Sequence, residues 1–480
     1  MTTEKNKTIR NAAWLVIQRI GLIISGLVFG MIVPRLMGPA QYGQYALVMS
    51  LGIWSFALTD LGYNQILSRY VPVRALEPDG KNVRKLFGNL LVIRAFLGVA
   101  VASAYLVGTN LFLHDIDRLA LLAISIVVFV FSISDVIFHL FLGLNRAARW
   151  GVGNLLRRWL LVFCVPAGFV VGGLKGAACG VLFTELSVLV TGAFWARAYF
   201  SWEGLRIDFP CLLPLLRFGL LFFAGGLLLT AFRNTGEAIV RLVTGDYAQV
   251  GFYGLSFSVY LAGDAGIGQM IQSFTPFLSS LAARRENDAL RLWVERFLRG
   301  MTAIAVPVAF GAFMLADQVV PLVFGGAYQP VAANLKVLSL ALVAFIPGNV
   351  ASLMSVALER PAASLAASGV RLAAFWLLSI QLVTWRGSFG ICLAVLAAAI
   401  LFSAFLTIRI RKEFVYSLGK WALAILMAIP FFLLAALRSS SWAANLALFV
   451  VSTAGYWALL MRLNVVTVSE LKAVWRAVVK

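Results

Sequence analysis

The chain has 480 residues, of which 61% are hydrophobic and 12% are charged, and its mean hydropathy is +0.91. An ordinary soluble domain carries about 25% charged residues, so this chain cannot cover its surface with polar groups and the bilayer must be its main solvent. The net charge of +20 does not indicate nucleic-acid binding, because the basic residues punctuate apolar runs and do not gather on one patch.

Apolar runs long enough to cross a membrane recur along the whole chain. A helix needs about 20 residues to cross a hydrocarbon core of about 30 Å. The first run is too long for the apolar part of a cleavable signal peptide, so we interpret it as a retained span. Fourteen runs occur, at residues 11–33, 43–63, 86–108, 118–143, 150–172, 176–198, 213–243, 248–280, 301–323, 334–357, 362–385, 388–408, 418–437 and 442–461. The sequence therefore predicts an all-α polytopic membrane protein with about fourteen transmembrane helices.

The distribution of basic residues predicts the orientation of these spans. With the N-terminus in the cytoplasm, 26 of the 40 Lys and Arg residues fall in cytoplasmic segments, six in outer segments and eight within spans. We therefore expect both termini in the cytoplasm. The cytoplasmic connection at 282–299 has its apolar residues on one helical face, which predicts an amphipathic helix on the inner membrane surface.

Two stretches about 206–208 positions apart nearly repeat each other. The letters IVPRLMGPAQYGQYAL after the first span return as IVRLVTGDYAQVGFYGL near the seventh, and five of eight positions agree between Ala40–Leu47 and Ala248–Leu255. Each copy lies between two long apolar segments, which favours duplication over coincidence. We predict two pseudo-symmetric six-helix bundles, at residues 1–200 and 201–411, followed by two additional helices and a cytoplasmic tail at 412–480.

Charged residues inside the predicted spans are costly and usually face a cavity or a partner. Arg19 lies near the middle of the first predicted span with no acid within one turn, so we expect it to face water or an anion. Arg233 and Glu237 are four residues apart and can either neutralise each other or line a cavity. For Asp135 and His139, which share a face of the fourth span, simple pairing is favoured over a proton relay. The candidates for a polar cavity are Arg19, Asp60, Arg94, Arg233, Glu237 and Asp264.

Short motifs in the chain indicate packing and not soluble-enzyme chemistry. Two GxxxG patterns, Gly26/Gly30 and Gly176/Gly180, predict close approach of helices. The letters contain no GxxxxGK[ST], HExxH or GxSxG pattern, and two histidines leave little for acid–base or metal chemistry. The four cysteines are scattered and are interpreted as small apolar fillers. We therefore predict no enzyme, no cofactor and no metal.

Three stretches of the chain resemble the polysaccharide flippase family, the Wzx-like exporters of the MOP (multidrug/oligosaccharidyl-lipid/polysaccharide) superfamily. They are IVPRLMGPAQYGQYAL after the first span, VRLVTGDYAQVGFYGLSFSV with FTPFLSSL after it, and VVPLVFGGAYQPVAANLKVLSL at Val319–Leu340. Each motif is degenerate, and their order and spacing within a fourteen-span layout are what is specific. The resemblance covers nearly the whole chain.

This resemblance implies two six-helix bundles around a central cavity that is lined by the first, second, seventh and eighth spans. It also implies that the protein moves a lipid-linked oligosaccharide, typically on undecaprenyl pyrophosphate, across the bacterial inner membrane by alternating access. The expected partners are the glycan substrate, membrane lipids and other polysaccharide-assembly proteins, with no nucleic acid.

Two other classes of protein remain open from the sequence. Asp60, Glu237 and Asp264 are compatible with a multidrug or cation exporter of the same superfamily, which would favour an acidic cavity. A membrane polysaccharide polymerase or ligase is disfavoured, because such enzymes usually carry acids or Arg and His in sizeable external loops and the external loops here are short.

Overall fold

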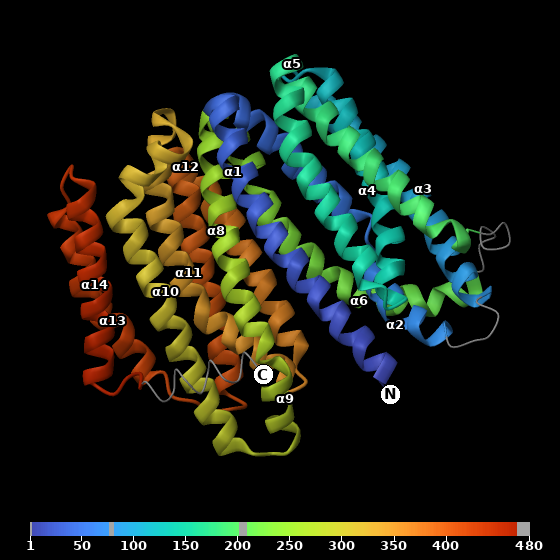
Figure 1. Ribbon diagram of the computed structural model, residues 1–480. Helices are drawn as coiled ribbons and strands as arrows, with labels where there is room; N and C mark the ends of the chain where they lie inside the picture. The colour runs from blue at the N-terminus through green and yellow to red at the C-terminus, as the bar shows by residue number, and fades with distance from the viewer. Residues whose placement is uncertain (1, 76–80, 201–208, 468–480) are drawn as a thin grey trace. The chain divides into compact units, whose positions relative to one another are not determined.

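The computed structural model describes residues 2–75, 81–200 and 209–467, and the predicted cytoplasmic tail beyond residue 467 lies outside them. The described ranges contain helices and no strand, which confirms the predicted all-α fold (Figure 1). The helices are α1 (Thr2–Leu58), α2 (Tyr63–Arg74), α3 (Lys81–Phe112), α4 (Arg118–Gly143), α5 (Ala147–Ala196), α6 (Phe209–Asn234), α7 (Gly236–Thr244), α8 (Tyr247–Ser273), α9 (Thr275–Ala283), α10 (Asn287–Phe324), α11 (Gln329–Ala357), α12 (Pro361–Arg411), α13 (Gly419–Leu433) and α14 (Trp442–Arg462).

Three of these helices are too long for one span because each is a pair that folds back on itself. In α1 the backbone turns at Gly38, which has a φ of 73°, and the Phe29 and Tyr45 rings on either side of the turn lie 6.5 Å apart. The turn of α5 lies at residues 172–173 and that of α12 at residues 386–387. The last two turns coincide with the predicted ends of spans at 172 and 385. A positive φ at each turn is the reason that glycine stands there.

With these turns counted, the helices reproduce the predicted number of spans. Nine helices of the described residues are long and apolar enough to cross a membrane. Dividing α1, α5 and α12 at their turns, and adding α6 and α8, gives fourteen segments. Helix α6 is bent by 44° between residues 220 and 223, and α8 carries Asp264 and several Gly and Ser residues. The chain is a multi-pass membrane protein.

The helices form two compact units, one within residues 1–238 and one within residues 239–480. In the first unit α4 packs against α3 and α5, α1 packs against α5, and α6 contacts α1 and α2. Its core joins α2, α3, α4, the end of α5 and the start of α6 through buried side chains such as Phe87, Phe141 and Leu212. The division into segments 1–200, 201–411 and 412–480 follows the sequence duplication and stays a prediction.

In the second unit the last two helices pack on α10. Phe310 of α10 contacts the rings of Phe432 and Tyr456, at centroid distances of 4.6 and 5.6 Å. Near one end of α10 the buried Arg299 donates from Nη1 to the carbonyl oxygen of Val465, at 2.6 Å. Near the other end Arg438 donates to the carbonyl oxygen of Phe313, at 3.2 Å. The α13–α14 pair and its flanking residues therefore contact α10 between Arg299 and Phe313 (Figure 1).

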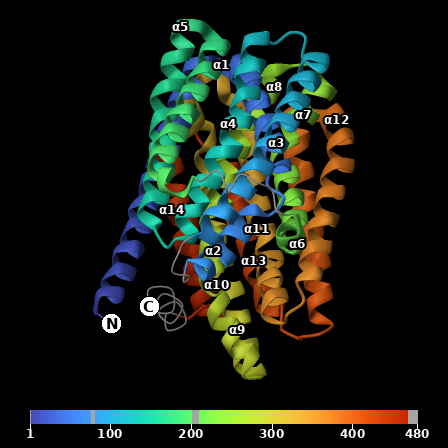
Figure 2. The same ribbon diagram turned by 90° about the vertical axis from the view of Figure 1, so that its right-hand side faces the viewer.

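The amphipathic segment predicted at 282–299 is not a separate surface helix. From Asn287 it forms the first turns of α10, whose 38 residues extend about 57 Å at 1.5 Å per residue. Val294 and Phe297 on its apolar face are buried against the protein. Both views show α9 and the start of α10 extending beyond neighbouring helices of the second unit (Figure 2). The sequence pattern predicts an apolar face on this segment but does not show whether lipid or protein covers it. In the structure, protein covers it.

Within the first unit, one of the two GxxxG patterns mediates close helix packing among the described residues. A Cβ on Gly176 would collide with the carbonyl oxygen of Gly168, and one on Gly180 would collide with that of Cys164, so the two halves of α5 touch backbone to backbone. The close packing predicted for Gly26 and Gly30 is not found within the first unit, where a Cβ at either position meets no described atom within 4 Å.

We expect Gly176→Ala to destabilise the protein by about 1–3 kcal/mol, because the two halves of α5 must separate to admit a methyl group. Gly26→Ala is the matched control, since the same change in open space replaces glycine with a better helix former. Thermal unfolding of the detergent-solubilised variants, followed by tryptophan fluorescence, measures both. Equal melting temperatures for the two variants would contradict the close packing within α5.

Candidate functional site

A short non-helical break connects α1 to α2, and residues of α3 and α6 contact this break. Residues 59–62 interrupt the helix, and Leu61 and Gly62 have φ values of 37° and 78°. A Cβ on Gly62 would collide with the carbonyl oxygen of Gly219 in α6, and one on Gly219 would lie 2.7 Å from the carbonyl oxygen of Leu61. Glycine at both positions therefore lets α6 cross the break at backbone contact distance. Asp60 lies within this break.

A buried arginine connects the break to the neighbouring helices. Arg94 of α3 is fully buried and donates from Nη1 to Oδ1 of Asp60, at 3.3 Å, and from Nη2 to Oδ2 of Asp135, at 3.0 Å. Its guanidinium also lies over the Phe56 ring, 5.3 Å from the centroid. His139 approaches Asp135 at 3.2 Å, which confirms the predicted pairing of these two residues.

A second buried ion pair lies beside the first and was not predicted. Arg157 Nε approaches Glu185 Oε1 at 2.9 Å, and Arg157 Nη2 donates to Ser134 Oγ at 3.1 Å. Ser134 precedes Asp135 in α4, so the two ion pairs share one region of the first unit. A glutamate inside an apolar span was the available signal, because such a group requires a buried partner.

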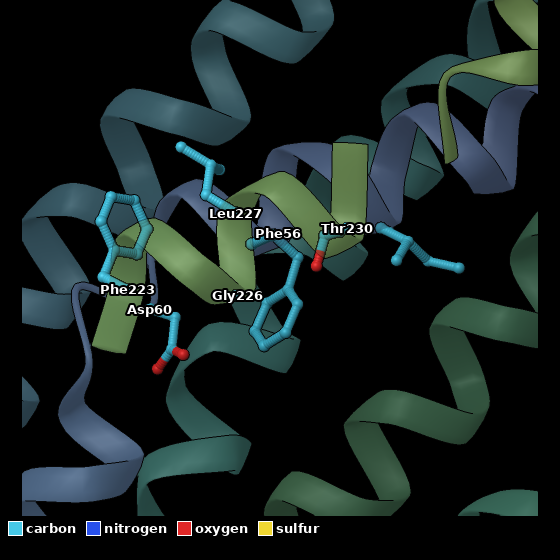
Figure 3. A pocket seen from close by; sticks show the side chains of 8 residues that line it. Phe56, Asp60, Phe223, Gly226, Leu227 and Thr230 are labelled. Carbon is cyan, nitrogen blue, oxygen red and sulfur yellow. The ribbon is translucent and has the colours of Figure 1, made fainter. Parts of the chain in front are cut away.

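A small pocket opens where the end of α1 faces α6, with a volume of about 170 Å³ (Figure 3). One wall carries Ile53, Phe56, Ala57 and Asp60, and the other carries Phe223, Gly226, Leu227 and Thr230. Each set follows the i, i+3, i+4, i+7 spacing of a single helical face. The Asp60 side chain is 32% exposed, whereas Arg94 behind it is 0% exposed. The pocket therefore meets the acceptor of this ion pair and not its donor.

Of the predicted cavity residues, the structure brings Asp60 and Arg94 together. Arg94 makes its contacts inside the first unit. Arg19 is exposed on α1, and Asp264 is half-buried in α8 of the second unit. The turn at Gly38 lies 19 residues after Arg19, about 28 Å along the helix. This length is close to the thickness of a hydrocarbon core, and the depth of Arg19 in its span stays a prediction.

A helix break separates Arg233 from Glu237. Helix α6 ends at Asn234 and α7 begins at Gly236, and Thr235 between them donates its hydroxyl to the carbonyl oxygen of Ala231, at 2.8 Å. The continuous helix that would pair residues four apart is therefore absent at this position. Glu237 is buried in the first turn of α7, and its Oε2 atom has no hydrogen-bond partner among the described residues.

The pocket walls contain residues that sequence reasoning missed, namely Phe56, Phe223, Gly226 and Thr230. Asp60 was found because it is charged. The other residues look like ordinary apolar span residues, and only the packing of α6 against α1 brings their two faces together. The groups of these residues that a ligand could contact are one carboxylate, one hydroxyl and two aromatic rings.

We expect Arg94→Met to destabilise the protein by about 3–5 kcal/mol, because it leaves two carboxylates without their buried cation. Arg84→Met on the exposed surface of α3 is the matched control and should be near neutral. Melting temperature and membrane abundance at equal expression report the difference. A variant at position 94 as stable as the one at position 84 would show that the ion cluster does not hold this unit together.

Comparison with known proteins gives one family and a shared fold. The family model described as "Polysaccharide biosynthesis protein" matches residues 32–333. No curated protein sequence matches the chain.

The solved structures with similar folds include transporters and a flippase. One is the lipid II flippase MurJ in an inward closed conformation, with a TM-score of 0.72, 14% identity, and coverage of 95% of this chain and 99% of that chain. Another is an inward-facing multidrug resistance MATE family transporter, with a TM-score of 0.67, 17% identity, and coverage of 82% and 94%. A third is a MOP superfamily transporter from Pyrococcus furiosus, with a TM-score of 0.52, 15% identity, and coverage of 85% and 96%.

At these identities the structural likeness establishes the fold, which is that of the MOP superfamily, as the sequence motifs predicted. The family model covers more than half of the chain. The chain therefore belongs to the polysaccharide biosynthesis protein family.

Proposed function

We propose that this protein is a flippase that moves a lipid-linked oligosaccharide, of the undecaprenyl-pyrophosphate type, across the bacterial inner membrane for export of a surface polysaccharide. It does so by alternating access, with both chain termini in the cytoplasm. The observation that carries the proposal is a combination of family and fold: a polysaccharide biosynthesis chain shares its fold, over 95% of its length, with a lipid II flippase.

The physical chemistry of such a substrate suits a bundle of this kind. The lipid tail can stay in the bilayer while the polar headgroup crosses through a wet cleft. An arginine fork donates two parallel hydrogen bonds to a pyrophosphate. An inside-negative potential favours outward movement of negative charge by about 2.3 kcal/mol per charge per 100 mV, so the step requires no ATP site.

The competing function is export of drugs or cations, which the MATE-like fold and the pocket-facing Asp60 favour. Asp60 is, however, already bound to a buried arginine. This compensation weakens the attraction of the pocket for a second cation. The family match is to polysaccharide biosynthesis. The fold that the chain shares with a flippase and a transporter favours a transporter over a polymerase or ligase.

Reconstitution into proteoliposomes tests the proposed function directly. We expect the wild-type protein to move an undecaprenyl-pyrophosphate-linked glycan from its native host between leaflets, measured by access of an added glycosidase or lectin. Empty liposomes give the background rate. Movement of lipophilic cations with no movement of the glycan lipid would favour the exporter instead.

The substrate's negative charge is expected to contact Arg19 and Arg233, and alanine and lysine variants test this. Each alanine variant should lower surface polysaccharide by roughly 10-fold or more at equal protein abundance, which corresponds to loss of about 1.5–3 kcal/mol from a charged hydrogen bond. Lysine at position 19 separates two roles of the cation. A snorkelling side chain tolerates lysine, whereas a bidentate phosphate contact does not. Normal polysaccharide in both alanine variants would exclude these residues from the site.

A further inference from the structure

The pocket between α1 and α6 offers hydrogen-bond acceptors beside apolar rings. Phe56 and Asp60 come from the end of α1 and the break after it, and Phe223 and Thr230 come from α6 (Figure 3). A carboxylate is an acceptor with two oxygens and about four lone-pair sites. A ligand of this pocket must therefore donate hydrogen bonds and present an apolar face to aromatic rings.

The charge around the pocket argues against both an anionic and a cationic ligand. A pyrophosphate would approach the Asp60 carboxylate, which repels it, while the Arg94 guanidinium behind this carboxylate is wholly buried. A cation would have to compete with Arg94, which already pairs with this carboxylate at 3.3 Å. The same guanidinium lies 5.3 Å from the centroid of the Phe56 ring that forms the pocket wall. The pocket is therefore best matched by a neutral ligand.

The size of the pocket restricts the ligand further. Its volume of about 170 Å³ is below the roughly 300–1,000 Å³ that is typical of sites for drug-sized molecules. It can hold one ring of a glycan but not an oligosaccharide together with its pyrophosphate. A sugar ring has the required chemistry, because its hydroxyl groups donate hydrogen bonds and its C–H face is apolar.

We infer that this pocket is a subsite for one neutral sugar ring of the transported glycan. Neighbouring hydroxyl groups of the ring donate to the Asp60 carboxylate, and the ring's C–H face lies against Phe56 or Phe223. The Thr230 hydroxyl supplies a further polar contact from the opposite wall. This assignment rests on the proposed function and adds to it which residues bind a sugar of the glycan.

Gly226 provides a way to close this pocket without disturbing the fold. It lines the pocket on α6, and a Cβ built there meets no described atom within 4 Å. Leucine is also a better helix former than glycine. Gly226→Leu should therefore fill the pocket while α6 stays intact. Gly108→Leu on α3 is the matched control, because Gly108 is also helical and open but does not line the pocket.

Binding to purified, detergent-solubilised protein tests the subsite with three probes. They are the undecaprenyl-pyrophosphate-linked glycan from the native host, undecaprenyl pyrophosphate without sugar, and the lipophilic cation tetraphenylphosphonium. We expect Gly226→Leu, and also Asp60→Asn, to weaken binding of the glycan lipid by about 10- to 100-fold, as for loss of hydrogen bonds to a charged group. Binding of the sugar-free lipid should change less than about twofold, and Gly108→Leu should bind all probes as the wild type does.

Different results of this experiment would contradict the subsite alone or the proposed function as well. Unchanged glycan affinity in Gly226→Leu overturns the subsite, as does an equal loss of affinity for the glycan lipid and the sugar-free lipid. Loss confined to tetraphenylphosphonium assigns the pocket to a cation and also overturns it. In each of these cases wild-type binding of the glycan lipid still supports the proposed function. A wild-type protein that binds neither lipid overturns the proposed function and the subsite together.

Discussion

The first unit is organised by the need to compensate one buried guanidinium. Transfer of an ion out of water costs several kcal/mol, which an apolar bundle recovers only through well-placed partners. Arg94 finds these partners in Asp60 and Asp135, at 3.3 and 3.0 Å. The carboxylates come from the break after α1 and from α4, so this one side chain of α3 fixes both. Because Asp60 is held from behind, its exposed edge forms a fixed wall of the pocket.

Close contact between the backbones of the α1–α2 break and α6 also positions the pocket walls. Gly62 and Gly219 remove both side chains from the crossing, so the backbones meet directly. This contact lies four residues before Phe223, and it sets the face of α6 that carries Phe223, Gly226 and Thr230 opposite the end of α1. The pocket is therefore a consequence of two glycines and one ion cluster.

Sequence reasoning predicted the elements better than their partners. Apolar length defined the spans, and the turns of α5 and α12 fell where the predicted runs ended. The pairing of Asp135 with His139 followed from helical periodicity. Contacts between distant segments were missed, because periodicity shows which face is polar or apolar but not what covers it. The Arg157–Glu185 pair and the burial of Phe297 in α10 both depend on such long-range packing. The break at Thr235 was missed because no proline or glycine run marks it.

The exposed edge of Asp60 and the exposed Arg19 belong to different chemical tasks. Where a cation and a carboxylate lie close together inside this protein, they bind each other, as Arg94 and Asp60 do. Recognition of a glycan that carries hydroxyl groups and a pyrophosphate needs free acceptors and free donors at once. These can coexist only if they are kept apart or if a buried counter-charge satisfies one of them first. Arg94 fills that second role in the first unit, since it pairs with the Asp60 carboxylate without reaching the pocket. The exposed edge of Asp60 is the acceptor that would bind sugar hydroxyls in the proposed subsite, while Arg94 holds it from behind.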